Sequence, residues 1–315
     1  MVNFFSKNKS MVNFVIHPGI VKTGTTFFQN NVVPNIHSTL SIGKPYNNRI
    51  SKKIKKIFYS NKNLKNELKE ISNQIIDYLE INQTKNIIFS DEILLDSEFH
   101  NTNKNFNKLG SLISLLKIKS KINLYILITI RSQEKLIKSR YGFIYPVLKK
   151  KYQNIDQYVS NGIKRSKFFN NLKYSYLEKK INKFFKAKVI FLPLEYLEND
   201  KKNYKRVLIK LFGKKVSFEQ MSFEKINKLS ENNIFYKRKG NLWFYLYIFL
   251  SKFSFIRYLN EIFKSFKLNQ FFYKKIKFDK SKKKININSL TSIKIRKFYD
   301  KDNKILFKKH GIKYT

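Results

Sequence analysis

Short apolar runs alternate with amphipathic segments along the first two thirds of the chain. Runs of this kind, bounded by polar residues, are typical of strands that are buried on both faces of a sheet. Between the runs, apolar residues recur at spacings of three and four, which is the period of a helix with one buried face. The pattern predicts strands at residues 12–16, 86–90, 122–130 and 187–192, and helices at residues 25–31, 51–59, 64–79, 109–118, 133–141, 155–185 and 197–212.

This order of elements predicts an α/β fold. Strands that alternate with helices are joined by right-handed crossovers, which make the sheet mostly parallel and place helices on both of its faces. We expect a single three-layer domain over residues 1–315, with its core at about 11–213. Residues 214–290 would form a helical insertion or cap, with a charged linker at 279–284, and residues 291–312 a C-terminal helix.

A turn of unusual composition follows the first predicted strand. Residues 17–26 are His-Pro-Gly-Ile-Val-Lys-Thr-Gly-Thr-Thr, and the next residues begin a helix. The first N–H groups of a helix have no intrahelical partner and carry the positive end of its dipole, so they attract anions. Gly24 lets the backbone approach a ligand closely, and Lys22 adds a cation. Three hydroxyl donors complete a candidate phosphate site: Thr23, Thr25 and Thr26.

The spacing of this turn differs from the loop that binds ATP in ordinary nucleotide hydrolases. That loop needs two glycines five positions apart and a lysine directly after the second. Gly19 and Gly24 have this spacing, but Thr25 occupies the lysine position and Lys22 precedes Gly24 by two residues. An ATP or GTP hydrolase is therefore not expected. A kinase-like enzyme that uses Lys22 from this position, with Asp91 as a magnesium ligand, stays open as an alternative.

Polar residues also follow two further predicted strands. Ser90, Asp91 and Glu92 come at the end of the second strand, and Arg131 comes directly after the third. Because the carboxyl ends of parallel strands meet at one edge of the sheet, these residues are expected beside the turn. Glu92 is a candidate general base, although the same segment also fits a helix start capped by Ser90 or Asp91. Arg131 and Ser139, about two helical turns apart, can hold one phosphate.

Three motifs resemble those of sulfotransferases that use 3′-phosphoadenosine 5′-phosphosulfate (PAPS). Residues 18–26, Pro-Gly-x-x-Lys-Thr-Gly-Thr-Thr, resemble their 5′-phosphosulfate loop. The Arg…Ser-x-Tyr arrangement from Arg131 to Tyr141 resembles their 3′-phosphate element, except that Ser132 stands where such families often have proline. Ser-x-Glu at residues 90–92 is similar to bacterial carbohydrate sulfotransferases. Further similar segments are residues 189–197, 208–213 and 298–306, and the triplet at 238–240, which resembles a loop that closes over the 3′-phosphate.

The resemblance implies a P-loop-like fold and transfer of a sulfuryl group from PAPS to a hydroxyl, for which we expect a glycan or glycolipid acceptor. Lys22 would stabilise charge at the transferred group, and Glu92 would take the acceptor proton, with His17 and His100 as rival bases. No metal ion is implied. The residues implied in binding PAPS are Lys22, Thr23, Gly24, Thr25, Thr26, Arg131, Ser139, Arg238, Lys239 and Gly240.

The composition adds a second alternative from a different class. A formal net charge of +44 suggests a nonenzymatic basic protein that binds nucleic acid or a membrane surface. Lysine, asparagine, isoleucine and phenylalanine are spread evenly along the chain and no nucleic-acid motif accompanies them, so we expect compositional drift and no specific nucleic-acid partner. The chain has no cysteine, which excludes disulfides and thiol catalysis and is compatible with the cytoplasm.

One segment is a candidate for membrane contact. Residues 242–259 are rich in aromatic and aliphatic side chains, but Lys252 and Arg257 interrupt them. The segment is shorter than the roughly 20 apolar residues that a spanning helix needs. The pattern is compatible with a buried or capping helix and with a peripheral membrane contact.

Overall fold

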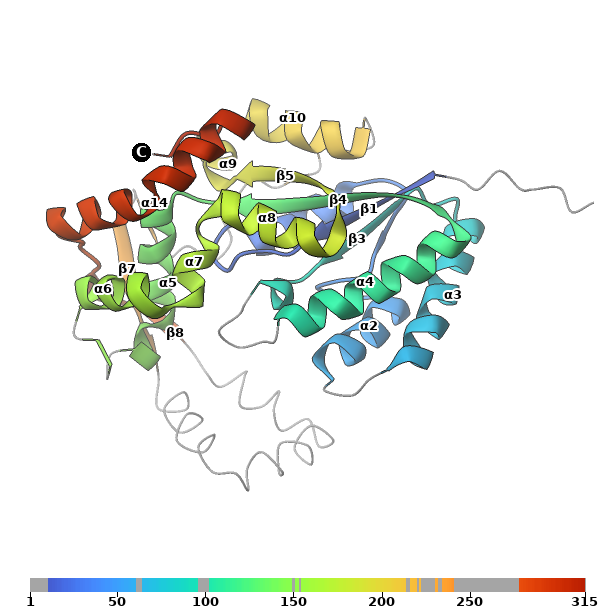
Figure 1. Cartoon of the computed structure of the whole chain (residues 1–315), viewed down its shortest axis with the longest axis horizontal. Helices are drawn as coiled ribbons and strands as arrows, with labels where there is room; N and C mark the ends of the chain where they lie inside the picture. The colour runs from blue at the N-terminus through green and yellow to red at the C-terminus, as the bar shows by residue number, and fades with distance from the viewer. Residues whose placement is uncertain are drawn as a thin grey trace, which may run out of the picture. The chain divides into compact units, whose positions relative to one another are not determined.

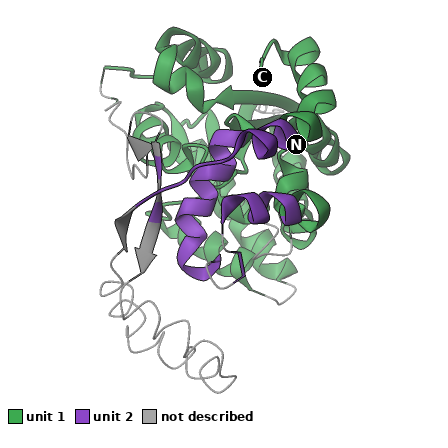
Figure 2. Ribbon diagram, turned by 90° about the vertical axis from the view of Figure 1, so that its left-hand side faces the viewer, with its two compact units in different colours: residues 1–133, 162–226, 296–315 green, residues 134–161, 227–295 purple. Residues whose placement is uncertain are grey.

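The computed structural model describes residues 11–60, 64–95, 102–148, 151–152, 154–213, 216–219, 221, 230–231, 234–240 and 278–314 (Figure 1). The chain divides into two compact units (Figure 2). Unit 1 contains residues 1–133, 162–226 and 296–315, and unit 2 contains residues 134–161 and 227–295. The sequence predicts a single domain. In the structure, segments of the two units alternate along the chain.

A five-stranded sheet forms the centre of unit 1. Its strands lie in the order β2-β3-β1-β4-β5, and every pair of neighbours is parallel. The four strands predicted from apolar runs are present, which confirms an α/β fold with a parallel central sheet. A short fifth strand, β2, was not predicted. The strands are β1 (Met11–His17), β2 (Thr39–Ser41), β3 (Asn86–Ser90), β4 (Lys121–Ile130) and β5 (Lys188–Pro193).

Helices lie along the chain between these strands and after β5, where the spacing of apolar residues predicts them. The helix after β1 begins as α1 (Thr25–Phe27) and continues as the π-helical η1 (Phe28–Val32) and the 3₁₀ turn η2 (Val33–Asn35). The others are α2 (Arg49–Tyr59), α3 (Lys65–Ile81), the 3₁₀ turn η3 (Glu92–Leu94), α4 (Thr102–Lys119), α5 (Gln133–Leu148), α6 (Ile155–Arg165), α7 (Lys167–Asn171), α8 (Tyr174–Phe185), α9 (Leu194–Asn199), α10 (Lys201–Phe212) and α14 (Ser289–His310).

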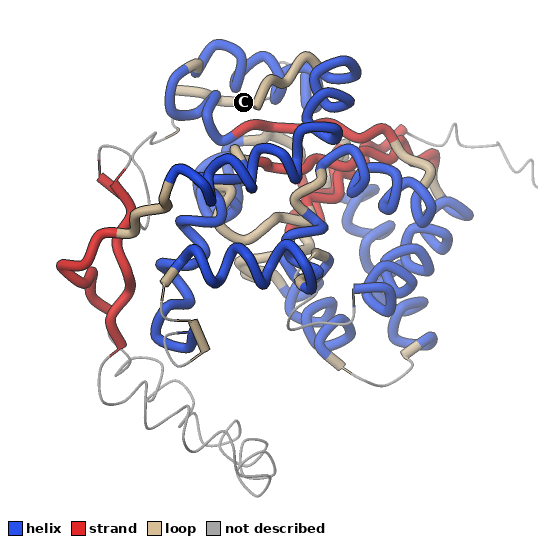
Figure 3. Tube along the Cα trace, turned by 60° about the vertical axis from the view of Figure 1, so that its left-hand side comes forward, coloured by secondary structure: helices blue, strands red, loops and turns tan. Residues whose placement is uncertain are grey.

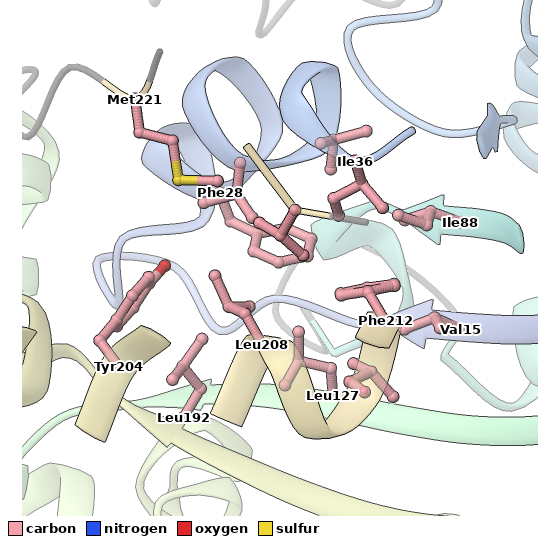
Figure 4. Packing of buried hydrophobic residues seen from close by; sticks show 14 of the residues in the cluster. Val15, Phe28, Ile36, Ile88, Leu127, Leu192, Tyr204, Leu208, Phe212 and Met221 are labelled. Carbon is pink, nitrogen blue, oxygen red and sulfur yellow. The ribbon is translucent and has the colours of Figure 1, made fainter. Parts of the chain in front are cut away.

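Both faces of the parallel sheet are covered by helices. Phe58 of α2 packs against Phe89 of β3, with 4.9 Å between the ring centroids. Ile88 precedes Phe89 and therefore points to the opposite face, since side chains alternate along a strand. On that face, a buried cluster joins the strands to the helix after β1 and to α10 (Figure 4); it includes Val15, Phe28, Ile88, Leu127, Leu192, Leu208 and Phe212.

The described residues of unit 2 form a small antiparallel sheet and parts of three helices. The sheet has the order β6-β7-β8, formed by β6 (Ser230–Glu231), β7 (Ile234–Gly240) and β8 (Phe278–Lys284) (Figure 3). Residues 230–231, 234–240 and 278–284 are thus strands, where the sequence predicts a helical insertion or cap and a charged linker at 279–284. Residues 241–277 of that region lie outside the described residues. Helix α14 occupies the place of the predicted C-terminal helix. The membrane candidate, residues 242–259, lies outside the described residues.

Candidate functional site

The structure brings three of the polar segments identified in the sequence to one edge of the sheet in unit 1. Strand β1 lies between β3 and β4, and all three run in the same direction. The turn after β1, the Ser90–Glu92 segment at the end of β3, and Arg131 after β4 therefore leave the carboxyl ends of adjacent strands. In open parallel sheets ligands bind at this edge, particularly at the strand on either side of which the chain adds its later strands. Here that strand is β1, with β2 and β3 on one side and β4 and β5 on the other.

The turn after β1 has a backbone that exposes helix amides. Lys22 and Gly24 both have positive φ, 75° and 87°, and the first helical hydrogen bond runs from Phe28 N to Gly24 O at 3.0 Å. No side chain of a described residue caps this helix start. The first amides of the helix are thus available to an anion. A Cβ on Gly24 would lie 2.7 Å from Leu194 Cδ1, the end of a flexible side chain that can shift, so the positive φ is the main reason for glycine at this position.

The threonines of the turn have different surroundings. Thr23 is fully buried, and its Oγ1 donates to Ile20 O at 2.6 Å and contacts Thr129 Oγ1 at 2.8 Å. Thr25 Oγ1 donates to the same Ile20 carbonyl at 3.2 Å. These two hydroxyls hold the turn in shape, and the Thr23–Thr129 contact ties it to strand β4. Thr26 is exposed, and so it is the threonine whose hydroxyl is most accessible to a ligand.

His17 links the three strand ends. Its Nδ1 lies 2.7 Å from Ser90 Oγ on β3, and its Nε2 lies 3.2 Å from Thr129 Oγ1 on β4. The ring is completely buried, and burial lowers its pKa to about 3. Gln29 Nε2 also donates to Ser90 Oγ, at 3.0 Å. A neutral, enclosed imidazole with both nitrogens engaged supports a packing role for His17 better than its alternative role as a base.

Asp91 is enclosed by donors. Its carboxylate accepts from Ile93 N at 3.1 Å, from the Tyr46 hydroxyl and from the Tyr59 hydroxyl, and it lies 3.2 Å from Lys44 Nζ. Its side chain has no exposed surface. Burial, followed by the nearby Asp91 charge, raises the pKa of Tyr46 and raises that of Tyr59 to about 12, so both phenols remain donors. Asp91 is therefore a cap of η3 and an anchor for its neighbours.

Lys44 connects this anchor to Glu92. Its Nζ lies 2.5 Å from Glu92 Oε2, and the Glu92 side chain is 18% exposed. Burial lowers the pKa of Lys44, but Asp91 and Glu92 raise it by more, so the net pKa lies above the ordinary lysine value. Lys44 N donates to Ser90 O at 2.9 Å, which fixes the loop against β3. Sequence reasoning missed Lys44 because one lysine in a polar loop carries no pattern in a chain that is rich in lysine throughout.

Arg131 is buried at the end of β4. Its main-chain carbonyl accepts from the Tyr174 hydroxyl at 2.5 Å, and its Nη2 lies 3.8 Å from Glu198 Oε1. Glu195 accepts from the next amide, Ser132 N, at 2.9 Å, and from the Tyr314 hydroxyl at 3.1 Å. The backbone at the strand end is therefore held on both sides, while Glu198 balances part of the guanidinium charge.

The remaining candidate residues lie in unit 2 or outside the described residues. Ser139 is buried in α5. Arg131 belongs to unit 1 and Ser139 to unit 2, so their joint grip on a phosphate stays a prediction. The triplet Arg238, Lys239 and Gly240 ends strand β7 and pairs with β8, so its backbone is a strand and not the loop that the sequence suggests. His100 lies outside the described residues.

The comparisons do not assign the chain to a family. No family model matches it, and no curated protein matches it significantly. Among the described residues, no group of three His, Cys, Asp or Glu side chains is arranged to hold a metal ion. The described helices also include none with both the length and the apolar character needed to cross a bilayer.

Proposed function

We propose that this protein is a sulfotransferase that moves a sulfuryl group from PAPS to a hydroxyl of a carbohydrate acceptor. One observation carries the proposal. The Lys22–Thr26 turn and Arg131 leave the carboxyl ends of adjacent parallel strands, and the 2.8 Å contact between Thr23 and Thr129 ties the turn to a point two residues before Arg131. Two cationic groups at one edge suit a donor with two separate phosphates.

In such a transfer, each candidate residue would have its own role. The amides at the helix start and the Thr26 hydroxyl would bind the 5′-phosphate, and Arg131 the 3′-phosphate. Lys22 would neutralise the charge that develops on the 5′-phosphate oxygen as its bond to sulfur breaks. Glu92 would take the proton of the acceptor hydroxyl as its oxygen bonds to sulfur. As in phosphoryl transfer, positioning and charge stabilisation would supply most of the catalysis.

The surroundings of Asp91 favour this proposal over the kinase-like alternative. A kinase-like enzyme would need Asp91 as a magnesium ligand. The carboxylate instead accepts from a main-chain amide and two tyrosines and pairs with Lys44, and its side chain has no exposed surface. A metal ion would have to displace several of these donors at once.

Calorimetric titration with 3′-phosphoadenosine 5′-phosphate in the presence of a magnesium chelator tests the proposal. We expect wild-type protein to bind the nucleotide, and Lys22→Ala and Arg131→Gln to weaken binding by at least about tenfold each. The exposed residues Lys202 and Arg206 provide controls, because Lys202→Ala and Arg206→Gln remove the same charges outside the site. Magnesium-dependent ATP binding would favour the kinase-like enzyme. Binding to polyanions alone, unchanged in both site variants, would favour the basic protein.

A further inference from the structure

A groove of about 470 Å³ lies in unit 1 beside strand β2. Its walls come from the helix after β1, from β2 and the loop that follows it, and from Tyr78 in the last turn of α3. The volume falls within the range of natural ligand sites, about 300–1,000 Å³. The groove is separate from the turn that the proposed function assigns to the donor.

The lining of the groove is uncharged. Charged residues make up 27% of the chain, yet none of the twelve residues that line the groove carries a charge. A charged ligand would lose hydration here and gain no opposite charge, which makes its binding costly. The polar groups are amides and hydroxyls, which both donate and accept hydrogen bonds; they belong to Gln29, Asn30, Thr39, Ser41, Asn47, Asn48 and Tyr78. Gln29 Nε2 and the Asn48 amide already have partners within the protein, so the other side chains offer the readier contacts.

The groove also offers apolar contacts between its polar groups. Pro34, Pro45 and Leu40 line it together with the ring of Tyr78, which is 36% exposed. A ligand that fits both kinds of surface has hydroxyls around its rim and C–H groups on its faces. Sugar rings have this character, and an open groove accommodates several rings of a chain in succession.

Two residues connect the groove to the candidate base. Gln29 lines the groove, and its Nε2 donates to Ser90 Oγ, two residues before Glu92. Pro45 lines the groove from the loop side, directly after Lys44, whose ammonium lies 2.5 Å from Glu92. A chain bound in the groove would therefore contact the loop that positions Glu92.

We infer that this groove binds an uncharged glycan segment of the acceptor, next to the sugar that is modified. The assignment as acceptor rests on the proposed function, whereas glycan binding itself does not. The inference narrows the acceptor to glycans with a neutral stretch of sugars, and it places their recognition on the β2 side of unit 1.

A glycan array followed by calorimetry tests this inference in the absence of any donor. We expect wild-type protein to bind neutral oligosaccharides, and to prefer them over sulfated or sialylated ones at an ionic strength that suppresses nonspecific charge attraction. Tyr78→Ala removes the aromatic wall, and Asn47→Trp fills the groove from an exposed position; each should weaken binding by about tenfold. Tyr176→Ala is the matched control, because Tyr176 is an exposed helical tyrosine of unit 1 that does not line the groove.

The outcomes separate the two proposals. If no neutral glycan binds, or if both groove variants bind as wild type does, the groove inference is wrong. If neutral glycans bind in the groove but no transfer from PAPS is detected, the inference holds and the proposed function fails. If transfer occurs and both groove variants keep the wild-type KM for the acceptor, the proposed function holds and the groove inference fails.

Discussion

Replacement of Lys44 by methionine tests the arrangement at the end of β3 most directly. Methionine keeps the length and the apolar stem of the side chain and removes only the ammonium group. That group lies 3.2 Å from Asp91 Oδ1 and 2.5 Å from Glu92 Oε2. The variant leaves Asp91 buried with its tyrosine and amide donors but without its only positive partner among the described residues.

The size of the effect follows from distance and burial. At 3.2 Å, one ion pair is worth about 1 kcal/mol at the dielectric constant of water and about 5 kcal/mol at an effective value of 20. The Lys44 side chain is 35% exposed, so solvent screens the pair and the net effect lies near the lower end. Asp91 also keeps its other donors. We expect Lys44→Met to reduce the free energy of unfolding by about 1–2 kcal/mol.

The pH dependence gives this prediction a second test. The folded state raises the pKa of Lys44 above the ordinary lysine value. The stabilisation is therefore fully present below the unfolded-state pKa of about 10.4 and is lost only as the pH rises through the folded-state pKa. Urea unfolding at pH 7 and at pH 9 should give the same difference between Lys44→Met and wild type.

Two controls make the measurement interpretable. Lys53 forms a similarly short pair with Glu70, at 2.7 Å, but the Glu70 side chain is 58% exposed, so Lys53→Met should have no measurable effect. Lys44→Arg should restore part of the stability. Under the proposed function, Lys44→Met should also reduce turnover without changing nucleotide affinity. Equal stability of Lys44→Met and wild type at pH 7, or a difference that shrinks between pH 7 and pH 9, would refute the reasoning.

Three further predictions concern the same edge of the sheet. Glu92→Gln should reduce turnover at least about a hundredfold while leaving the affinity for 3′-phosphoadenosine 5′-phosphate unchanged; unchanged turnover would remove Glu92 as the base. Gly24→Ala should cost about 1–3 kcal/mol of stability and abolish nucleotide binding, because its φ is 87° and its Cβ would meet Leu194; calorimetry and urea unfolding check both effects. The wild-type protein should lose stability as the pH falls below 6.5 towards 3, because the folded state lowers the pKa of His17 to about 3 and the unfolded state binds the proton first. His17→Gln should show a shallower loss between pH 6.5 and pH 4.5 in urea unfolding; an unchanged slope would contradict this.

The sequence predicts those strands whose own residues form an unambiguous hydrophobic pattern. Strands β1, β3, β4 and β5 are apolar runs between polar residues, and burial on both faces of a parallel sheet explains that pattern. Strand β2 has three residues, of which only Leu40 is buried. It is defined by pairing with β3 and by Asn48 Nδ2, which donates to Ser41 O at 2.6 Å. Neither contact has a signal in the local sequence.

The small sheet of unit 2 escaped prediction for a related reason. Strand β8 has the sequence Phe-Asp-Lys-Ser-Lys-Lys-Lys, in which no apolar residue alternates with a polar one. Antiparallel pairing with β7 determines its conformation. The tendency of a residue to form a strand depends largely on the neighbours it packs against. Without knowledge of the pairing with β7, the charged sequence of β8 therefore predicts a linker.

In the candidate site, too, some residues could be recognised from the local sequence and others could not. The turn after β1 was recognisable because glycine, lysine and threonine occur together at a strand end, where their chemistry is specific. Lys44 was not recognisable, because its role comes from the pairing of β2 with β3, which brings the loop after β2 beside Glu92. Its importance depends on two acids that lie 47 and 48 residues further along the sequence.

The electrostatic character of the site separates it from the rest of a chain with a net charge of +44. The turn offers a lysine and helix amides to an anion. At the end of the adjacent strand, two carboxylates share the Lys44 ammonium, so that this cluster keeps one negative charge in excess. The groove beside β2 is uncharged. A protein that attracts polyanions through its overall charge needs no such separation, and salt would weaken its binding steeply. Transfer from an anionic donor to a neutral acceptor does need it, because the donor, the base and the acceptor require different surroundings within one site.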